Sequence, residues 1–576
     1  MSNAAGVRES SILIPIVLGI TGHRDLRAED IPELEKKLCL IFSELKNSYP
    51  HSPLILLSPL AEGADRLAAR SALNCGVRLV VPLPMSKEEY EKDFITPQSL
   101  AEFNNLLGEA ENAFELPPLE NFNEERDHKY AKVGAYIVQY SHILIAMWDG
   151  MDTDLTGGTA QIVRFKLNGV PEPYAPPQNI LDPVDTGPVF HIVTPRVKNP
   201  SPAGDVFSIN KYFPGGSNIE GKPEEALAGI LESIEGFNRD AGELALDLKS
   251  KIEASRVQLI PKGVEGMLGK KAKAILERFA LADSLAVHFQ EKRVSTLVNL
   301  FILAVIAFFF FELYAHLIQE SFMIALYPAT LLLASILYIW VKKHGYENKH
   351  LDYRALAEGL RIQLFWKLTG LREDVTRYYL RKQKSELDWV RKGIETFNIS
   401  VPGAGGAEGS GEKAFWLSNC RLTLDHWVLD QRKYYKKTSS RDHSKLKRQE
   451  TMVYGFFLAG LAIAILVFFL DISSSHTDSL KLIHHILIVA MGLAPALAAA
   501  LDGYAEKMAF AAQNKVYKRM YNLFDRASVQ LRSMWENSDL DCARSLIREL
   551  GREALQENSD WVLLHRERPM KIPMGG

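Results

Sequence analysis

Residues Ile12–Arg24 read ILIPIVLGITGHR, and this stretch decides the fold of the first part of the chain. Its apolar portion is too short to span a bilayer. It runs into a polar, charged flank rather than a small-residue cleavage site, so it is not a secretory signal. A continuous Val/Ile/Leu run of this length is typical of a strand that is buried on both faces of a parallel sheet.

Runs of the same kind recur as far as residue 194, and helical stretches separate them. This alternation predicts an α/β, Rossmann-like domain with a parallel sheet and helices on both faces. The expected strands are Ile12–Ile20, Leu54–Ser58, Val77–Leu83, His142–Trp148 and Val189–Thr194. The expected helices are Ile31–Lys46, Gly63–Asn74, Lys87–Asp93 and Arg126–Tyr140.

Four short motifs fall after predicted strands, at the sheet edge where ligands of such folds bind. They are GITGHR, SPLAEGADR, WDG and TGGTAQ, and the last is typical of a glycine turn that cradles a phosphate and enters a helix. We therefore predict a site for an anionic, nucleotide-like ligand, with no catalytic and no metal-binding residue assigned. Its residues are Gly19, Thr21, Gly22, His23, Arg24, Ser58, Glu62, Gly63, Asp65, Arg66, Asp149, Gly157, Gly158, Thr159 and Gln161. Further candidates on the fourth helix are Arg126, His128, Lys129 and Tyr130.

Each motif also has a structural interpretation. Most glycine turns only reverse the chain, and His23 alone is more typical of a structural residue. Asp65 and Arg66 are open to interpretation as a surface ion pair that contributes little energy. The coincidence of all four motifs at one edge of one sheet favours a nucleotide pocket.

The second half of the chain contains four apolar runs of spanning length, at about 297–313, 322–341, 452–470 and 482–501. A helix needs roughly 20 mainly apolar residues to cross the hydrocarbon of a bilayer. The connection 342–451 is crowded with Lys and Arg, whereas the two short linkers contain a single Lys. The positive-inside rule therefore places this connection and both termini in the cytoplasm. Glu312, near the end of the first run, lies at the interface or lines a pore.

Helices are also expected outside the membrane, over 342–451 and 503–568 and from about Lys270 to Val294, directly before the first run. A net charge of −3 gives no support to nucleic-acid binding, which usually requires a strongly basic domain. The cysteines Cys39, Cys75, Cys420 and Cys542 are far apart in the sequence and have no metal-ligand spacing. We interpret them as isolated, reduced thiols.

Several strings resemble known families. GITGHRDL, SPLAEGADRLAA and WDG…TGGTAQ are similar to the SLOG superfamily, Rossmann-like relatives of the cytokinin-activating LOG enzymes and of DprA. The C-terminal half resembles the SLATT family of membrane effector domains. The strings that carry this second resemblance are RALAEGLRIQLFW (Arg354–Trp366), Trp427…Gln431…Tyr434-Tyr435 and LGREALQENSDWVLLHRERP (Leu550–Pro569). The chain then divides into a SLOG-like domain (1–200), an irregular linker with connecting helices (201–280) and a SLATT-like domain (281–576).

The resemblance implies an effector of bacterial antiphage defence, embedded in the inner membrane as a homo-oligomer. Its SLOG-like domain would sense a nucleotide second messenger made by a separate enzyme, of a cyclic-nucleotide, NAD-derived or ADP-ribose-like kind. The signal would make the membrane helices form a pore or disrupt the bilayer.

One departure from the LOG pattern bears on catalysis. The LOG enzymes have an acid just after the glycine turn, whereas here Ala160, Gln161, Ile162 and Val163 follow Thr159. Glycosidic cleavage requires carboxylates, so the departure favours binding without hydrolysis. A membrane-anchored nucleotide or NAD glycohydrolase stays an alternative, with Glu62 or Asp149 as the substitute acid. A regulated channel or transporter is a third reading, disfavoured because the spans contain few polar residues.

Overall fold

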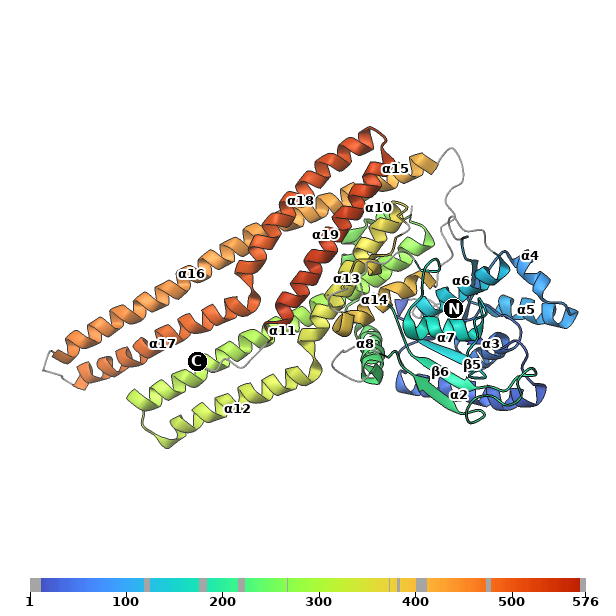
Figure 1. Ribbon diagram of the computed structural model, residues 1–576. Coiled ribbons are helices and arrows are strands. Elements are labelled where there is room, and N and C mark those ends of the chain that lie inside the picture. Colours follow the sequence, from blue (N-terminus) through green and yellow to red (C-terminus); the bar gives the residue numbers. More distant parts are fainter. Residues whose placement is uncertain are drawn as a thin grey trace.

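The computed structural model describes residues 12–118, 125–175, 184–215, 223–266, 268–371, 373–380, 384–399, 412–472 and 478–569. An α/β domain lies at one end of the molecule and long helices extend from it (Figure 1). Seven strands form one sheet in the order β4-β3-β2-β1-β5-β6-β7. All neighbouring pairs are parallel except β6 and β7. The strands are β1 (Ile16–Gly22), β2 (Leu54–Leu57), β3 (Arg78–Leu83), β4 (Asn112–Glu115), β5 (Ile143–Trp148), β6 (Val189–Val193) and β7 (Ile209–Tyr212).

Helices cover both faces of the sheet, which confirms the predicted Rossmann-like class. One face packs against α2 (Ile31–Ser48), α3 (Ala64–Asn74) and α5 (Pro97–Glu109). The other face packs against α6 (Arg126–Tyr140) and α7 (Thr159–Asn168). The strand interiors are fully buried, as expected for a sheet covered on both sides.

One predicted strand boundary was wrong, for an identifiable reason, and two predicted segments differ in kind. β1 begins at Ile16 rather than Ile12, because Pro15 lacks an N–H and the Asn238 side chain takes both backbone groups of Ile14. The predicted helix Lys87–Asp93 is a short turn, α4 (Lys87–Tyr90), followed by a 3₁₀ turn (Glu91–Asp93). The segment after Asn199, expected to be irregular, contains β7.

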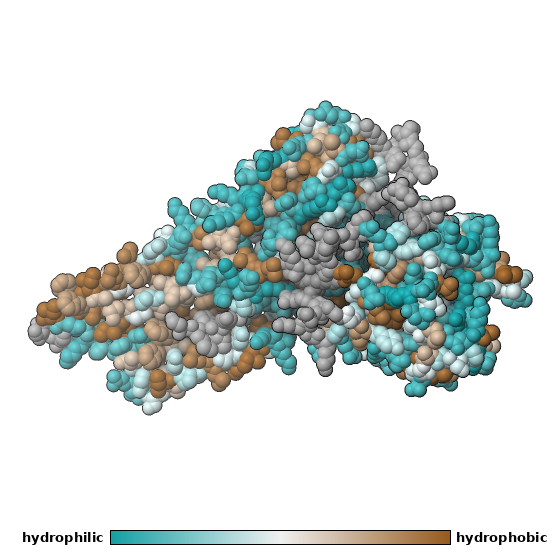
Figure 2. All heavy atoms as spheres, in the orientation of Figure 1, coloured by the Kyte–Doolittle hydropathy of each residue, from teal (hydrophilic) through white to brown (hydrophobic). Residues whose placement is uncertain are grey.

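Among the residues that the structure describes, four helices are long and apolar enough to cross a membrane. Their spanning parts lie in α11 (Lys270–His316), α12 (Ser321–His344), α16 (Leu429–Ile472) and α17 (Asp478–Met508). Figure 2 shows apolar residues gathered over the end of the molecule that these helices form. Large apolar side chains are exposed there, among them Leu332, Ile339, Phe457, Leu458 and Phe469. The chain is thus compatible with a multi-pass membrane protein.

The helical part repeats one pattern twice. A long helix (α11 or α16) turns back into a second helix (α12 or α17), which ends at a residue in the left-handed conformation, Gly345 or Ala509. Another helix, α13 (Tyr346–Leu368) or α18 (Phe510–Glu536), then follows. α11 is continuous over 47 residues, which confirms that the helix from Lys270 runs directly into the first apolar run.

Further helices complete the bundle between the sheet and the spans. They are α8 (Pro223–Leu244), α9 (Lys249–Leu259), α10 (Lys262–Glu265), α14 (Lys384–Ile399), α15 (Glu412–Thr423) and α19 (Leu540–Arg566). One apolar core runs without interruption from the sheet face covered by α2 into this bundle. The cysteines are free thiols, but Cys39 and Cys75 are not isolated, because their sulfur atoms lie 3.1 Å apart.

Candidate functional site

The strand order creates a topological switch point between β1 and β5. β2, β3 and β4 extend the sheet on one side of β1, whereas β5 and β6 extend it on the other. Ligands of open α/β sheets bind outside the carboxyl ends of the strands at such a point. His23 and Arg24 follow β1, and Asp149 follows β5, so these three predicted residues lie at the switch point.

His23 and Asp149 join the two sides of the switch point. The Asp149 N–H donates to His23 Nε2 at 3.1 Å, and that nitrogen lies 3.1 Å from Asp149 Oδ1. Burial lowers the pKa of His23, with Arg196 acting in the same sense, although the Asp149 carboxylate opposes both. A neutral imidazole that accepts at Nε2 fits this arrangement.

The Asp149 carboxylate is buried and already accepts several hydrogen bonds. Arg196 Nε (2.9 Å) and Asn199 Nδ2 (3.0 Å) donate to Oδ2, and the Met151 N–H (3.2 Å) donates to Oδ1. Burial raises the pKa of Asp149, but the bonds from Asn199 and Met151 and the nearby His23 bring it below its ordinary value. Asp149 therefore positions the loops around the switch point.

Sequence reasoning missed Arg196 and Asn199. Both follow β6, whose carboxyl end lies at the same edge as those of β1 and β5. The signal was present, since Val189–Thr194 was predicted as a strand and the residues after it were open to the same argument.

The loops that follow β1 and β2 pack against each other through their backbones. A Cβ on Gly63 (φ +79°) would lie 2.4 Å from the carbonyl oxygen of Arg24, and the Ala64 N–H donates to His23 O at 3.0 Å. A Cβ on Gly22 would lie 2.4 Å from the Ala64 Cβ. Both glycines are therefore required by chain packing alone.

Arg24 and the TGGTAQ turn meet at Tyr130. The guanidinium carbon of Arg24, an exposed residue, lies 4.9 Å from the centre of the Tyr130 ring. Gly157 (φ +74°) packs so closely on Tyr130 that an added Cβ would lie 2.8 Å from the Tyr130 Cβ. The Gly157 N–H donates to Gln161 Oε1 at 2.7 Å, and α7 begins at Thr159 with no side chain capping its first turn. The exposed Arg24 side chain and the glycine turn before α7 thus both lie against Tyr130.

Asp65 lies beneath this edge in the first turn of α3. It is buried, and burial raises its pKa from the ordinary 3.8 to about 7, although Arg24, the Ala61 N–H and Arg66 act in the opposite sense. The reading of Asp65 and Arg66 as a surface ion pair was wrong, because both side chains are buried.

Other predicted residues take part in internal contacts. The buried Arg66 donates to Leu60 O (3.0 Å), Ser99 O (2.8 Å) and Glu102 (3.2 Å) and stacks on Phe94. Those contacts give Arg66 a structural role. The remaining contacts are as follows: Ser58 Oγ donates to Asp65 O, Glu62 accepts from Ser99, and a Cβ on the buried Gly19 would clash with Ile137 of α6.

Thr21 and Gly158 lie closer to the predicted edge. Thr21 is half-buried in β1 opposite Ala146 of β5, and Gly158 is the half-exposed residue before α7.

In the described part of the chain, no three His, Cys, Asp or Glu side chains are placed to hold a metal ion.

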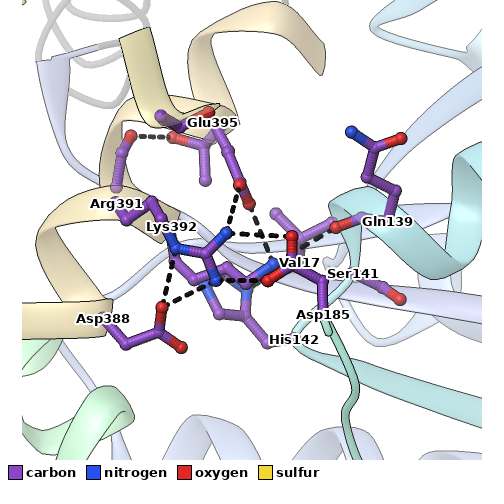
Figure 3. Close-up of polar contacts among 12 residues, drawn as sticks. Val17, Gln139, Ser141, His142, Asp185, Asp388, Arg391, Lys392 and Glu395 are labelled. Carbon is purple, nitrogen blue, oxygen red and sulfur yellow. Dashed lines mark hydrogen bonds and ion pairs between the residues drawn. The ribbon is translucent and has the colours of Figure 1, made fainter. Parts of the chain in front are cut away.

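The opposite edge of the sheet meets the helical part through charges that are buried on α14 and partly exposed at Asp185 (Figure 3). Arg391 of α14 binds Asp185, in the loop before β6, at 2.8 Å, and also contacts Asp388 (2.7 Å) and Glu395 (3.2 Å). Lys392 binds Glu395 (2.9 Å) and donates to Gln139 O (3.2 Å) at the end of α6. We call Asp185, Asp388, Arg391, Lys392 and Glu395 the junction cluster.

His142 lies beside the junction cluster, at the start of β5. Its Nδ1 accepts the Val17 N–H at 2.9 Å. Burial lowers the pKa of His142 to about 3, and the nearby Lys392 and Lys166 act in the same sense. His142 is thus a neutral residue that ties β5 to β1 at this edge.

Two helices connect the two edges. α6 begins near Arg24 with Tyr130 and ends at the junction with Gln139, and its 15 residues span about 22 Å. α7 begins at the glycine turn, and Lys166 near its end donates to Ser141 O at 2.6 Å, beside the junction. No known protein family and no curated protein matches the chain.

Proposed function

We propose that the chain is a membrane effector that a nucleotide-derived small molecule switches on. The observation that carries the proposal is that α6 begins at the strand-end site and ends with Gln139, which accepts from Lys392 of the junction cluster, while α7 begins at the same site and ends beside the cluster, with Lys166 bound to Ser141. A ligand that moves α6 at its start displaces Gln139 against α14, and one that moves α7 acts through Lys166 on the segment next to it.

The proposed ligand is anionic, because the two available features attract negative charge. The exposed Arg24 offers a planar fork of donors suited to phosphate oxygens. The first turn of α7, preceded by Gly157 and Gly158, offers backbone N–H groups and the positive end of the helix dipole. A phosphate between them, with a sugar or base near Tyr130, fits an ADP-ribose-like, NAD-derived or cyclic-nucleotide signal.

The route from the junction to the membrane consists of direct contacts. Trp389 Nε1 of α14 donates to Asp352 of α13 at 3.2 Å, and Arg354 of α13 binds Asp283 of α11 at 2.7 Å. α11 then continues into the apolar end of the molecule. A ligand shifts this assembly only through a difference in its affinity for two arrangements.

The proposal extends to a biological role by the SLOG and SLATT resemblance. In this role, a separate enzyme makes the signal during phage infection. A homo-oligomer of this chain in the bacterial inner membrane then forms a pore or disrupts the bilayer. N- and C-termini lie in the cytoplasm, where the signal is made.

A glycohydrolase is the second candidate, and one observation favours it. Asp65 is a carboxylic acid whose pKa of about 7 suits proton transfer, and it lies close enough to Arg24 to feel its charge. Against a glycohydrolase, both candidates for the acid that LOG enzymes have after the glycine turn are already hydrogen-bonded. Glu62 accepts from Ser99, and Asp149 accepts from Arg196 and Asn199.

Binding and turnover assays on the detergent-solubilised full chain separate the two candidates. Labelled NAD, ADP-ribose and cyclic nucleotides are the probes. Saturable binding without a product supports the sensor, whereas release of a base or nicotinamide supports the glycohydrolase.

We expect Gly158→Arg, which fills the entrance to α7, to abolish binding. Gly108→Arg is the matched control, because its Cβ would meet open space on α5. Unchanged affinity in Gly158→Arg contradicts the site.

A further inference from the structure

Two glycine contacts fix how α11 lies against α17. An added Cβ at Gly492 would lie 2.8 Å from the Glu312 carboxylate, and one at Gly503 would lie 3.1 Å from the Phe301 ring. Eleven residues separate the two contacts in each helix, which is three turns. α11 and α17 therefore run antiparallel, and these positions define their register.

This register offsets the two hairpins along the membrane normal. Gly492 is in the middle of the apolar run 482–501, whereas Glu312 is almost the last residue of the run 297–313. The run in α17 continues ten residues past the contact, but α11 ends four residues past it, at His316. The outer end of the apolar run in α17 thus lies about 9 Å beyond the last residue of α11. Figure 1 shows the α16–α17 hairpin extending farther than α11–α12.

The offset places Glu312 at an unfavourable depth. A bilayer centred on the α16–α17 hairpin puts this carboxyl group in the middle of the hydrocarbon, where an ionisable side chain is costly. The side chain is only 12% exposed and rests on the bare backbone of Gly492, and His316 of the same helix lies 3.6 Å away. An outward shift of α11 would bring Glu312 to the interface and match both hairpins to one bilayer.

The face of α17 on which α11 now lies is smooth between Gly492 and Gly503, and Val489 and His485 continue it outward. Gly492, Ala496, Ala499 and Gly503 recur at helical spacing, and no side chain among them exceeds a methyl group. Small residues let helices in lipid approach closely without interdigitating side chains that would fix one register.

We propose that the Glu312–Gly492 contact is a latch that holds the α11–α12 hairpin in a withdrawn position. The effector step is then an outward slide of α11 along α17 by about two turns. This deepens the proposed function and rests on its placement of the four helices in a membrane, but not on the identity of the ligand.

Cross-linking between introduced cysteines tests the register while Glu312 is kept. Phe301→Cys with Gly503→Cys reports the withdrawn position, and Val294→Cys with Gly503→Cys reports the position after the slide. Both chains are placed in vesicles of phosphatidylethanolamine and phosphatidylglycerol and oxidised, and peptide mass spectrometry quantifies the links. Without any ligand, we expect several-fold more of the first link. Equal or reversed yields overturn the register.

Gly492→Leu tests the latch, because its side chain would displace the Glu312 carboxylate. We expect it to shift cross-linking toward the Val294 pair and to raise the leakage of trapped dye several-fold. Gly455→Leu in α16 is the matched control, since its Cβ meets no atom within 4 Å. If Gly492→Leu matches this control in both readouts, the latch is refuted. Cross-linking and dye leakage are both measured without ligand, so a defect in nucleotide binding changes neither. Failure of the latch can therefore be distinguished from failure of the sensor.

Discussion

The two edges of the sheet use charge in opposite ways. At the carboxyl edge, Arg24 is an exposed cation among glycine turns that pack backbone against backbone. At the other edge, Arg391 and Glu395 are buried and pair with neighbours from two parts of the chain. The first edge is suited to exchange a small anion with solvent, and the second to hold the α/β domain firmly on the helical part. α6 and α7 belong to both.

The largest expected effect is at the junction cluster. Arg391→Ala removes the Arg391 cation from Asp185 and Asp388 and leaves Glu395 with Lys392 alone, and breaking a buried pair in this way costs about 3–5 kcal/mol. Denaturant unfolding of the α/β domain in the full chain measures the loss. Arg70→Ala, which removes the partly exposed pair with Glu102, is the control and should cost about 0–1 kcal/mol. Equal losses would mean that the two edges do not differ.

A slightly smaller effect is expected beneath the ligand edge, through pH. Folded Asp65 holds its proton up to about pH 7, whereas the unfolded chain releases it near pH 4. The contribution of Asp65 to the free energy of unfolding is therefore largest below about pH 4 and falls by up to about 4 kcal/mol as the pH rises to 7. Asp65→Asn should remove this part of the slope, seen as a smaller drop in Tm between about pH 4 and pH 7. Parallel profiles for the two proteins would show that Asp65 is not held protonated.

The smallest effect on stability, and a large one on binding, is expected at the ligand edge. Arg24→Ala should change stability by no more than about 0.5 kcal/mol, because the side chain is exposed. Loss of a charge-assisted bond to phosphate should weaken nucleotide binding by roughly tenfold or more. Lys36→Ala on α2 removes an equally exposed charge and should change neither quantity. A binding constant that is the same in both variants would remove Arg24 from the site.

Apolar runs predicted the elements whose residues are continuously apolar, such as the buried strand β2 and the spanning parts of the four long helices, whose apolar side chains are largely exposed. They could not predict β4, with the sequence NAFE, or β7, with INKY, because these edge strands are short and largely polar. At the site, each motif was found by its position after a strand. The sequence could not show which of those side chains are already hydrogen-bonded within the protein, as Asp149 and Arg66 are.

Contacts between distant segments escaped the sequence altogether. Arg391 and Lys392 belong to a charged helix typical of a solvated surface, yet Arg391 meets Asp185, 206 residues earlier in the chain. The offset between α11 and α17 is likewise invisible in either helix alone, because hydropathy gives the length of a span and not its depth relative to a neighbour.

Hydrogen exchange on the full chain in lipid nanodiscs tests the central claim most directly. Exchange is compared without ligand and with saturating ADP-ribose, NAD or cyclic nucleotides, added one at a time. We predict slower exchange at the first turns of α6 and α7 and, in the same experiment, altered exchange in α14 around Arg391 and Lys392. A change confined to the starts of α6 and α7, with α14 unaffected, would contradict the account.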